Sequence, residues 1–105
     1  MSNHNFIGIL KDFITRAEIG LQSDIDFIME YLNPKSTIEI TRYVDYSLSL
    51  VENEIGIRHL EYYLFNGTQI QRNYSSLYFN RRGDHDLVVK AYKLGCIDEI
   101  QAFAR

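Results

Sequence analysis

The 105 residues have the composition of an ordinary globular protein, 46% hydrophobic and 24% charged, which excludes an intrinsically disordered chain. This length predicts a single domain over residues 1–105, with enough buried surface to fold without disulfide or metal. Eleven basic and fourteen acidic residues give a net charge of −3. That charge argues against nucleic acid as a general partner, because phosphate binding usually needs a basic surface.

Cysteine usage and the absence of targeting signals predict a cytoplasmic protein. The single cysteine, Cys96, cannot form a disulfide within the chain, which fits a reducing compartment. The first residues, MSNHNFIGILKDF, lack the basic segment and uninterrupted apolar run of a signal peptide. The apolar runs elsewhere are far shorter than a membrane span.

Two helices are predicted in the first third of the chain. Apolar residues at helical spacing favour a helix over residues 5–19, and Gly20 is a natural end for it. Ser23 is the expected N-cap of the second helix, with acidic residues in its first turn. Asn33-Pro34 is expected to end that helix, because the residue before proline disfavours helical geometry.

Residues 36–53 fit two patterns. Ser36 followed by Glu39 is a capping box, which marks a helix start. The apolar residues then fit a helical stripe, but between residues 38 and 50 they also show the alternation typical of a strand. We expect a helix, because a lone strand needs a partner and no other segment has this pattern. The alternative is an α+β fold with a strand over residues 38–50.

The run from residue 57 to residue 98 gives the clearest pattern, with apolar helical stripes that end at Gly67, Gly83 and Gly95. It predicts a helix over residues 55–65, a helix capped by Thr68, a helix capped by Asp84 and a short helix capped by residue 98. The expected stripe of the Thr68-capped helix comprises Ile70, Tyr74, Leu77, Tyr78 and Arg81. Short connections imply antiparallel neighbours. The predicted fold is therefore all-α, an array of short antiparallel helical hairpins.

The stretches LEYYLFNGTQIQ and GDHDLVVKAYKLGCID resemble ankyrin repeats over about residues 55–105. Gly83, Asp86, Leu87 and Gly95 follow the family's order of glycine, acidic residue, apolar helix and second glycine. The TPLH signature is absent, with SSLY from residue 75 in its place, and the loop is too short for the projecting hairpin. HEAT-type repeats are similar to these stretches to nearly the same degree. Either resemblance implies a protein-binding scaffold, usually without catalysis.

The sequence predicts no catalytic residue, metal site or cofactor. Arg81 to Asp86 is the densest polar run, and the end of one helix and the start of the next account for all of it except His85. His85 beside an aspartate is a possible general base, and Cys96 before a helix start is a possible nucleophile. These two residues are the basis of the alternative that the protein is a small enzyme.

A second alternative is a small nucleic-acid-binding regulator. Arg72 with Tyr74, or Arg81 and Arg82 with Tyr78, could stack on RNA bases. The acidic balance and the lack of a basic stripe argue against this alternative.

The acidic middle of the chain is the preferred candidate site. Acidic residues with tyrosines that the helical stripes do not need would suit a surface for a basic protein, because tyrosine supplies contact area and charge steers the encounter. The sequence thus predicts a non-enzymatic inhibitor, of the immunity or antitoxin type found in bacteria, that blocks a basic toxin or nuclease. The candidate partner-binding residues are Glu39, Arg42, Asp45, Tyr46, Glu52, Glu54, Glu61 and Tyr62.

Overall fold

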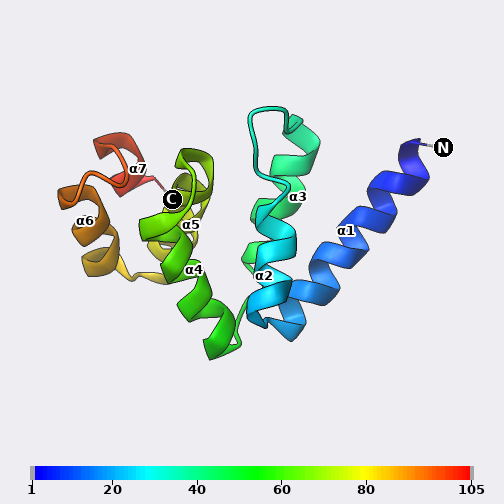
Figure 1. Cartoon of the computed structure of the whole chain (residues 1–105), viewed down its shortest axis with the longest axis horizontal. Coiled ribbons are helices and arrows are strands. Elements are labelled where there is room, and N and C mark those ends of the chain that lie inside the picture. The colour runs from blue at the N-terminus through cyan, green and yellow to red at the C-terminus, as the bar shows by residue number, and fades with distance from the viewer. Residues whose placement is uncertain (1, 105) are drawn as a thin grey trace. The chain divides into compact units, whose positions relative to one another are not determined.

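The computed structural model describes the backbone of residues 2–104 and the side chains of residues 8–104. Over this range the chain is all-α, with seven helices and no strand (Figure 1). The helices are α1 (Ser2–Ile19), α2 (Gln22–Met29), α3 (Ile38–Leu48), α4 (Glu54–Asn66), α5 (Gln69–Arg82), α6 (His85–Lys93) and α7 (Glu99–Phe103). None of the described helices is long and apolar enough to cross a membrane.

The chain divides into two compact units, unit 1 (Met1–His59) and unit 2 (Leu60–Arg105), and the boundary falls within α4. Each unit has its own buried apolar side chains and is described by itself. The expectation of a single domain stays a prediction.

In unit 1, α1 packs against both α2 and α3. Each helix contributes apolar side chains at a spacing of three or four residues, which places them on one face. The fully buried members of this core are Phe13, Ala17, Ile25, Ile28, Met29, Val44, Leu48 and Val51. An edge-to-face contact between Phe13 and Tyr31, with ring centroids 5.0 Å apart, closes one side of the core. The predicted side chains at residues 4–7 of α1 lie outside the described side chains.

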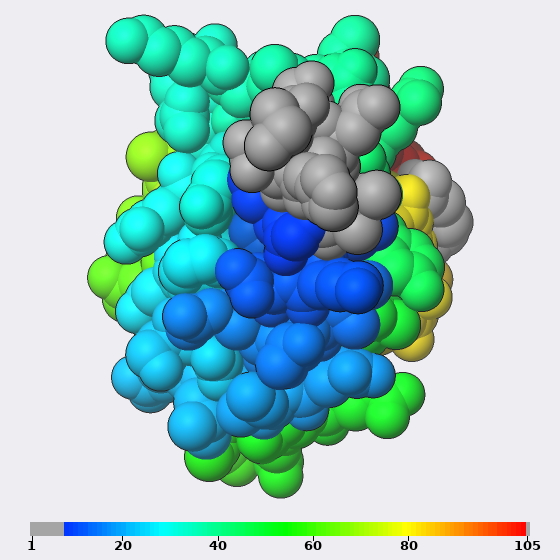
Figure 2. All heavy atoms as spheres, turned by 90° about the vertical axis from the view of Figure 1, so that its right-hand side faces the viewer, coloured from blue at the N-terminus to red at the C-terminus, as the bar shows by residue number. Residues whose placement is uncertain are grey.

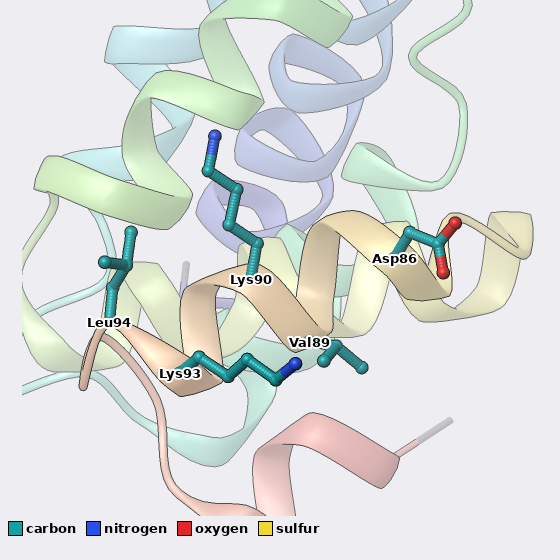
Figure 3. A pocket seen from close by; sticks show the side chains of 5 residues that line it. All are labelled: Asp86, Val89, Lys90, Lys93 and Leu94. Atoms are coloured by element: carbon teal, nitrogen blue, oxygen red, sulfur yellow. The ribbon is translucent and has the colours of Figure 1, made fainter.

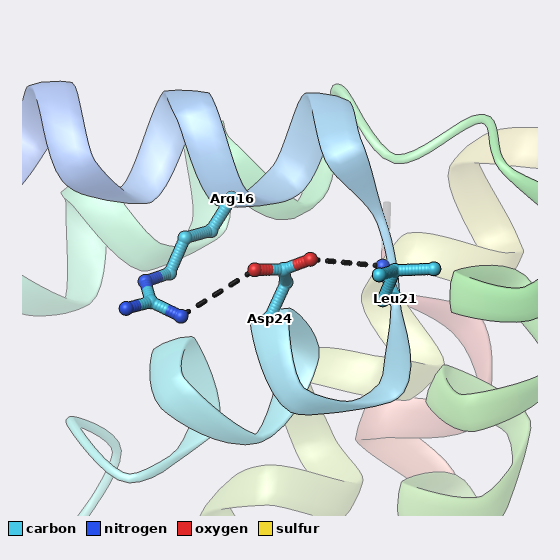
Figure 4. A network of polar contacts seen from close by, with 3 residues as sticks. All are labelled: Arg16, Leu21 and Asp24. Atoms are coloured by element: carbon cyan, nitrogen blue, oxygen red, sulfur yellow. Dashed lines mark hydrogen bonds and ion pairs between the residues drawn. The ribbon is translucent and has the colours of Figure 1, made fainter.

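The start of α2 differs from the prediction that Ser23 caps it. Leu21 occupies the N-cap position with an extended backbone, and Asp24 Oδ2 accepts a hydrogen bond from the Leu21 N–H at 3.1 Å. The other carboxylate oxygen, Oδ1, lies 3.4 Å from Arg16 Nη1 of α1 (Figure 4). The buried Asp24, paired with Arg16 of α1, therefore bonds to the N-cap backbone at the start of α2, and Ser23 is exposed.

The segment from residue 30 to residue 50 corrects two further expectations. Helix α2 ends at Met29, before Asn33-Pro34, and a turn follows in which Asn33 Oδ1 accepts a hydrogen bond from the Lys35 N–H at 2.9 Å. Helix α3 is capped by Thr37, whose hydroxyl accepts from the Ile40 N–H, whereas Ser36 belongs to the turn. The preference for a helix here is confirmed, and the alternative of a strand over 38–50 is wrong.

In unit 2, α5 packs against α6 and α7, which also contact each other. Thr68 caps α5 as predicted: its hydroxyl and the Gln71 side chain each accept a hydrogen bond from the other residue's N–H. Gly83 ends α5 with a φ of 87°, in the left-handed region that favours glycine. The buried side chains of this unit are Leu60, Leu64, Ser75, Ser76, Tyr78, Phe79, Asn80, Val88, Ala91, Ile97 and Ala102.

The predicted stripe of α5 is partly wrong. The buried face contains Ser75, Ser76 and Phe79 together with Tyr78, while Arg81 is exposed. Two of these buried positions are serines, so hydrophobicity alone does not mark the inner face.

Helices α6 and α7 lie where they were predicted, but the capping of α6 and the buried residue of α7 differ from the prediction. Asp98 caps α7, because its Oδ1 accepts from the Gln101 N–H at 2.8 Å. Asp84 occupies the N-cap position of α6, but its carboxylate pairs with Arg82 Nε at 3.1 Å and makes no capping bond. In α7, Ala102 is buried while Ile100 and Phe103 face solvent.

Candidate protein-binding surface

The outward side of α3 carries four of the predicted partner-binding residues. Glu39, Arg42 and Tyr46 are spaced three and four residues apart on one helical face, and all three are exposed. Ile38, at the start of the same face, is 69% exposed, and Tyr46 is 55% exposed. Asp45 lies at the edge of this face and is half-buried. We call Ile38, Glu39, Arg42 and Tyr46 the α3 face.

The remaining predicted partner-binding residues lie on and before α4. Glu52 and Glu54 belong to unit 1, and both are exposed. Glu61 and Tyr62 belong to unit 2 and are also exposed, and the Tyr62 ring contacts that of Tyr63 at a centroid distance of 5.8 Å. The eight residues are thus divided between the units, and their role in binding a partner stays a prediction.

Charge is distributed unequally between the two units. Unit 1 has nine acidic and five basic residues, a net charge of −4, whereas unit 2 has five acidic and six basic residues, a net charge of +1. The acidic character of the chain therefore belongs to unit 1. A positively charged partner is attracted to unit 1 in preference to unit 2.

His85 lies next to structural partners. Its Nδ1 is 3.2 Å from Asn80 Oδ1, and the amide nitrogen of this buried asparagine donates to the carbonyls of Ala102 and Ala104, each at 2.9 Å. The carboxylate of Asp84, the residue before His85, pairs with Arg82. Through these hydrogen bonds, Asn80 of α5 links the start of α6 to the end of α7, which is a structural role.

Arg72 makes a second set of structural hydrogen bonds in unit 2, one of them to the backbone of Cys96. Arg72 Nε donates to the Cys96 carbonyl at 2.6 Å, and Arg72 Nη1 donates to the Gly67 carbonyl at 2.7 Å. The Cys96 thiol lies 3.9 Å from the carbonyl oxygen of Phe65. The guanidinium that the RNA-binding alternative needed is therefore used to hold two turns of unit 2 together.

Arg82 also has partners within unit 2. Its guanidinium donates to the Tyr78 hydroxyl at 3.3 Å and lies over the Tyr78 ring, 5.6 Å from the centroid. The hydrogen bond to Tyr78, followed by the one to Asp84, holds the pKa of Arg82 above its usual value although burial opposes this. A base that stacks on Tyr78 would have to displace Arg82 from this ring.

One polar pair in unit 1 was missed by sequence reasoning. His59 Nε2 of α4 and Asp26 Oδ1 of α2 are 2.6 Å apart, and the His59 side chain is nearly buried. The residues are 33 positions apart, and the sequence showed only an isolated histidine and an acidic residue near a helix start. Only the tertiary fold brings the two together.

A hollow of about 400 Å³ beside α6 is lined by Asp86, Val89, Lys90, Lys93 and Leu94 (Figure 3). All five residues come from one helix and its C-cap, so the cavity is a shallow hollow and not an enclosed site. Among the residues that the structure describes, no group of three or more His, Cys, Asp or Glu side chains could hold a metal ion.

Comparison with known proteins gives no indication of function. No protein-family model, curated protein or solved structure matches this chain. The resemblance to ankyrin-like and HEAT-like repeats therefore stays a prediction. What is established is an all-α chain of seven described helices whose acidic residues are concentrated in unit 1.

Proposed function

We propose that this protein is a non-enzymatic interaction module that binds and blocks a basic protein through unit 1. One observation supports it above others: unit 1 combines its net charge of −4 with exposed large apolar side chains, those of Ile19, Leu21, Ile38, Tyr46 and Ile55. Exposed apolar groups supply contact area, and the surrounding charge speeds the encounter and selects partners of opposite sign.

The class of partner is a basic toxin or nuclease, and the proposed role is that of a cytoplasmic immunity or antitoxin protein. A nuclease active site is basic because it binds phosphates, so an acidic surface can cover it by imitating nucleic acid. The array of helical hairpins resembling degenerate ankyrin or HEAT repeats belongs to this proposal, because helical repeats commonly serve as binding scaffolds.

An inhibition assay tests the proposal. The full chain is titrated against basic ribonucleases and deoxyribonucleases and against the product of the neighbouring gene, with nuclease activity and binding measured together. We expect saturable inhibition of a basic enzyme at one-to-one stoichiometry. If the chain binds and inhibits none of these proteins, the proposed function is wrong.

Paired variants assign the inhibition to unit 1. Glu39→Lys and Tyr46→Ala on the α3 face should each weaken inhibition by about tenfold, which is a typical loss for an interface anchor. Glu99→Lys is the matched control, because it makes the same change of charge at an exposed position in unit 2. Equal effects of Glu39→Lys and Glu99→Lys would mean that only the total charge matters.

A further inference from the structure

Two turns of unit 1 that are distant in sequence lie together and expose three large apolar side chains. Ile19 ends α1 and is 50% exposed, Leu21 begins the next turn and is 45% exposed, and Ile55 in the first turn of α4 is 48% exposed. Asn53 Nδ2 donates to the Ile19 carbonyl at 2.9 Å, which joins the two turns. We call Ile19, Leu21 and Ile55 the apolar corner.

The backbone of each residue in the apolar corner is held by a side chain. Asn53 accepts a hydrogen bond from the Ile55 N–H at 3.0 Å while it donates to the Ile19 carbonyl. Asp24 accepts from the Leu21 N–H, and Arg16 holds Asp24 in turn (Figure 4). The three apolar side chains therefore stand on backbone that is already ordered, which lowers the conformational cost of binding a partner.

Close contact between two glycines sets the distance between the turns. A Cβ atom at Gly56 would lie 2.7 Å from the Gly20 carbonyl oxygen, and one at Gly20 would lie 2.8 Å from the Cβ of Asn53. Gly20 also has a φ of 70°, in the left-handed region. In Figure 2, light-blue atoms of the α1–α2 turn border green atoms at the lower edge of the face in view.

Carboxylates flank the apolar corner in the sequence. Glu18 precedes Ile19 and Glu52 precedes Asn53, and both are exposed without an ion pair among the described residues. Glu54 is also exposed, and its carboxylate is 3.4 Å from Arg58 Nη2. The other nearby cation, Arg16, is paired with Asp24. The residues around the apolar corner therefore leave an excess of negative charge.

From this geometry we infer that the apolar corner is the docking site for a basic, amphipathic helical segment of a partner protein. The apolar side of such a helix covers Ile19, Leu21 and Ile55, while its lysines or arginines reach Glu18 and Glu52. This inference rests on the proposed function, because it names the part of unit 1 that a basic partner contacts. It differs from the α3 face in its residues and in its test.

A model peptide tests the site directly. The probe is a fluorescent peptide of about 18 residues, five helical turns, with leucine on one side and lysine on the other. Binding to the full chain is measured by anisotropy, and the site is mapped by amide chemical-shift changes. Two control peptides keep one property each: one has glutamate in place of lysine, and the other has serine in place of leucine. We expect tight binding of the leucine–lysine peptide only.

The variants Leu21→Ser and Ile55→Ser should each weaken that binding by about tenfold, because each removes a half-exposed apolar side chain that the peptide buries. Both should fold, since position 21 is a helix N-cap where serine is favoured and position 55 lies in an exposed first turn. Ile100→Ser is the matched control at an exposed apolar position of unit 2, and it should leave the affinity unchanged.

Each outcome bears on the inference. Shifts centred on residues 19–21 and 52–55, with weaker binding by both corner variants, support it. Shifts confined to the α3 face, or affinity lost through Tyr46→Ala but not through the corner variants, overturn it and leave the proposed function standing. No binding of the leucine–lysine peptide also overturns it, while the nuclease assay decides separately whether the protein is an inhibitor.

Discussion

Replacing Asn53 should loosen the junction of the two turns in unit 1. The Asn53 side chain makes two hydrogen bonds that alanine cannot make, one to the Ile55 N–H at 3.0 Å and one from Nδ2 to the Ile19 carbonyl at 2.9 Å. The first is a helix cap, whose loss costs about 1 kcal/mol. The second is a hydrogen bond between segments, worth about another 1 kcal/mol.

We therefore expect Asn53→Ala to lower the free energy of unfolding by about 2 kcal/mol, which corresponds to a fall in Tm of roughly 10 °C for a protein of this size. Asn53→Asp separates the two contributions. Aspartate keeps the acceptor for the Ile55 N–H but loses the donor to the Ile19 carbonyl, so the loss should be about 1 kcal/mol.

Thermal unfolding by far-UV circular dichroism measures both variants, and amide hydrogen exchange locates the effect. The Ile55 amide should exchange faster in Asn53→Ala than in Asn53→Asp, because only aspartate keeps its acceptor. The control is Asn66→Ala, where the amide bonds to the Tyr62 carbonyl of its own helix at 3.0 Å. If Asn53→Ala were no more destabilising than Asn66→Ala, the two turns would not be held as described.

Three further predictions concern unit 2. Ser75→Ala should raise the free energy of unfolding by about 1 kcal/mol, because the Ser75 hydroxyl is buried without a hydrogen-bond partner. The equally buried Ser76 donates to the Asn73 carbonyl, so Ser76→Ala should bring no gain. Equal midpoints of urea unfolding for the two variants would refute this prediction. Asn80→Ala should cost about 2 kcal/mol and broaden the NMR signals of α7, because its amide holds two carbonyls there; unchanged α7 signals would contradict it. Arg72→Lys should lower Tm by several degrees, since lysine cannot reproduce the two-pronged contact with the carbonyls of Gly67 and Cys96; an unchanged Tm would contradict this role.

Local signals in the sequence were enough to predict most of the helices. The glycine at position 20, the capping box at Thr68 and the cap at Asp98 act through residues within a few positions, so the pattern specifies them directly. A helix was also expected within residues 36–53, where α3 now spans Ile38–Leu48, because no partner strand was available although the β-branched residues fit a strand.

The errors arose where a distant residue decides the outcome. Asp24 and not Ser23 supports the start of α2, because Arg16 of α1 lies beside it. The inner face of α5 includes the polar residues Ser75 and Asn80, and Asn80 bonds there to a carbonyl of α7. Neither arrangement leaves a trace in helical periodicity.

The candidate surface likewise has one part that the sequence predicted and one part that depends on contacts between distant residues. Glu39, Arg42 and Tyr46 of the α3 face were predicted from the acidic character of this segment and from a tyrosine that the helical stripe does not need, whereas the exposure of Ile38 was not predicted. The apolar corner was not predicted, because Ile19 meets Asn53 from 34 positions away and its apolar residues look like ordinary members of helical stripes. The unequal charge of the two units also became visible only once the boundary at residue 59 was known.

The most direct test of the account is to map where the full chain is contacted by the basic protein that it inhibits. Amide chemical-shift changes should gather in unit 1, at residues 19–21, 38–46 and 52–55, and binding should weaken steeply with added salt because opposite charges attract across the interface. Changes confined to α6 and α7, or an affinity that salt leaves unaltered, would contradict the assignment of the binding surface to the acidic unit.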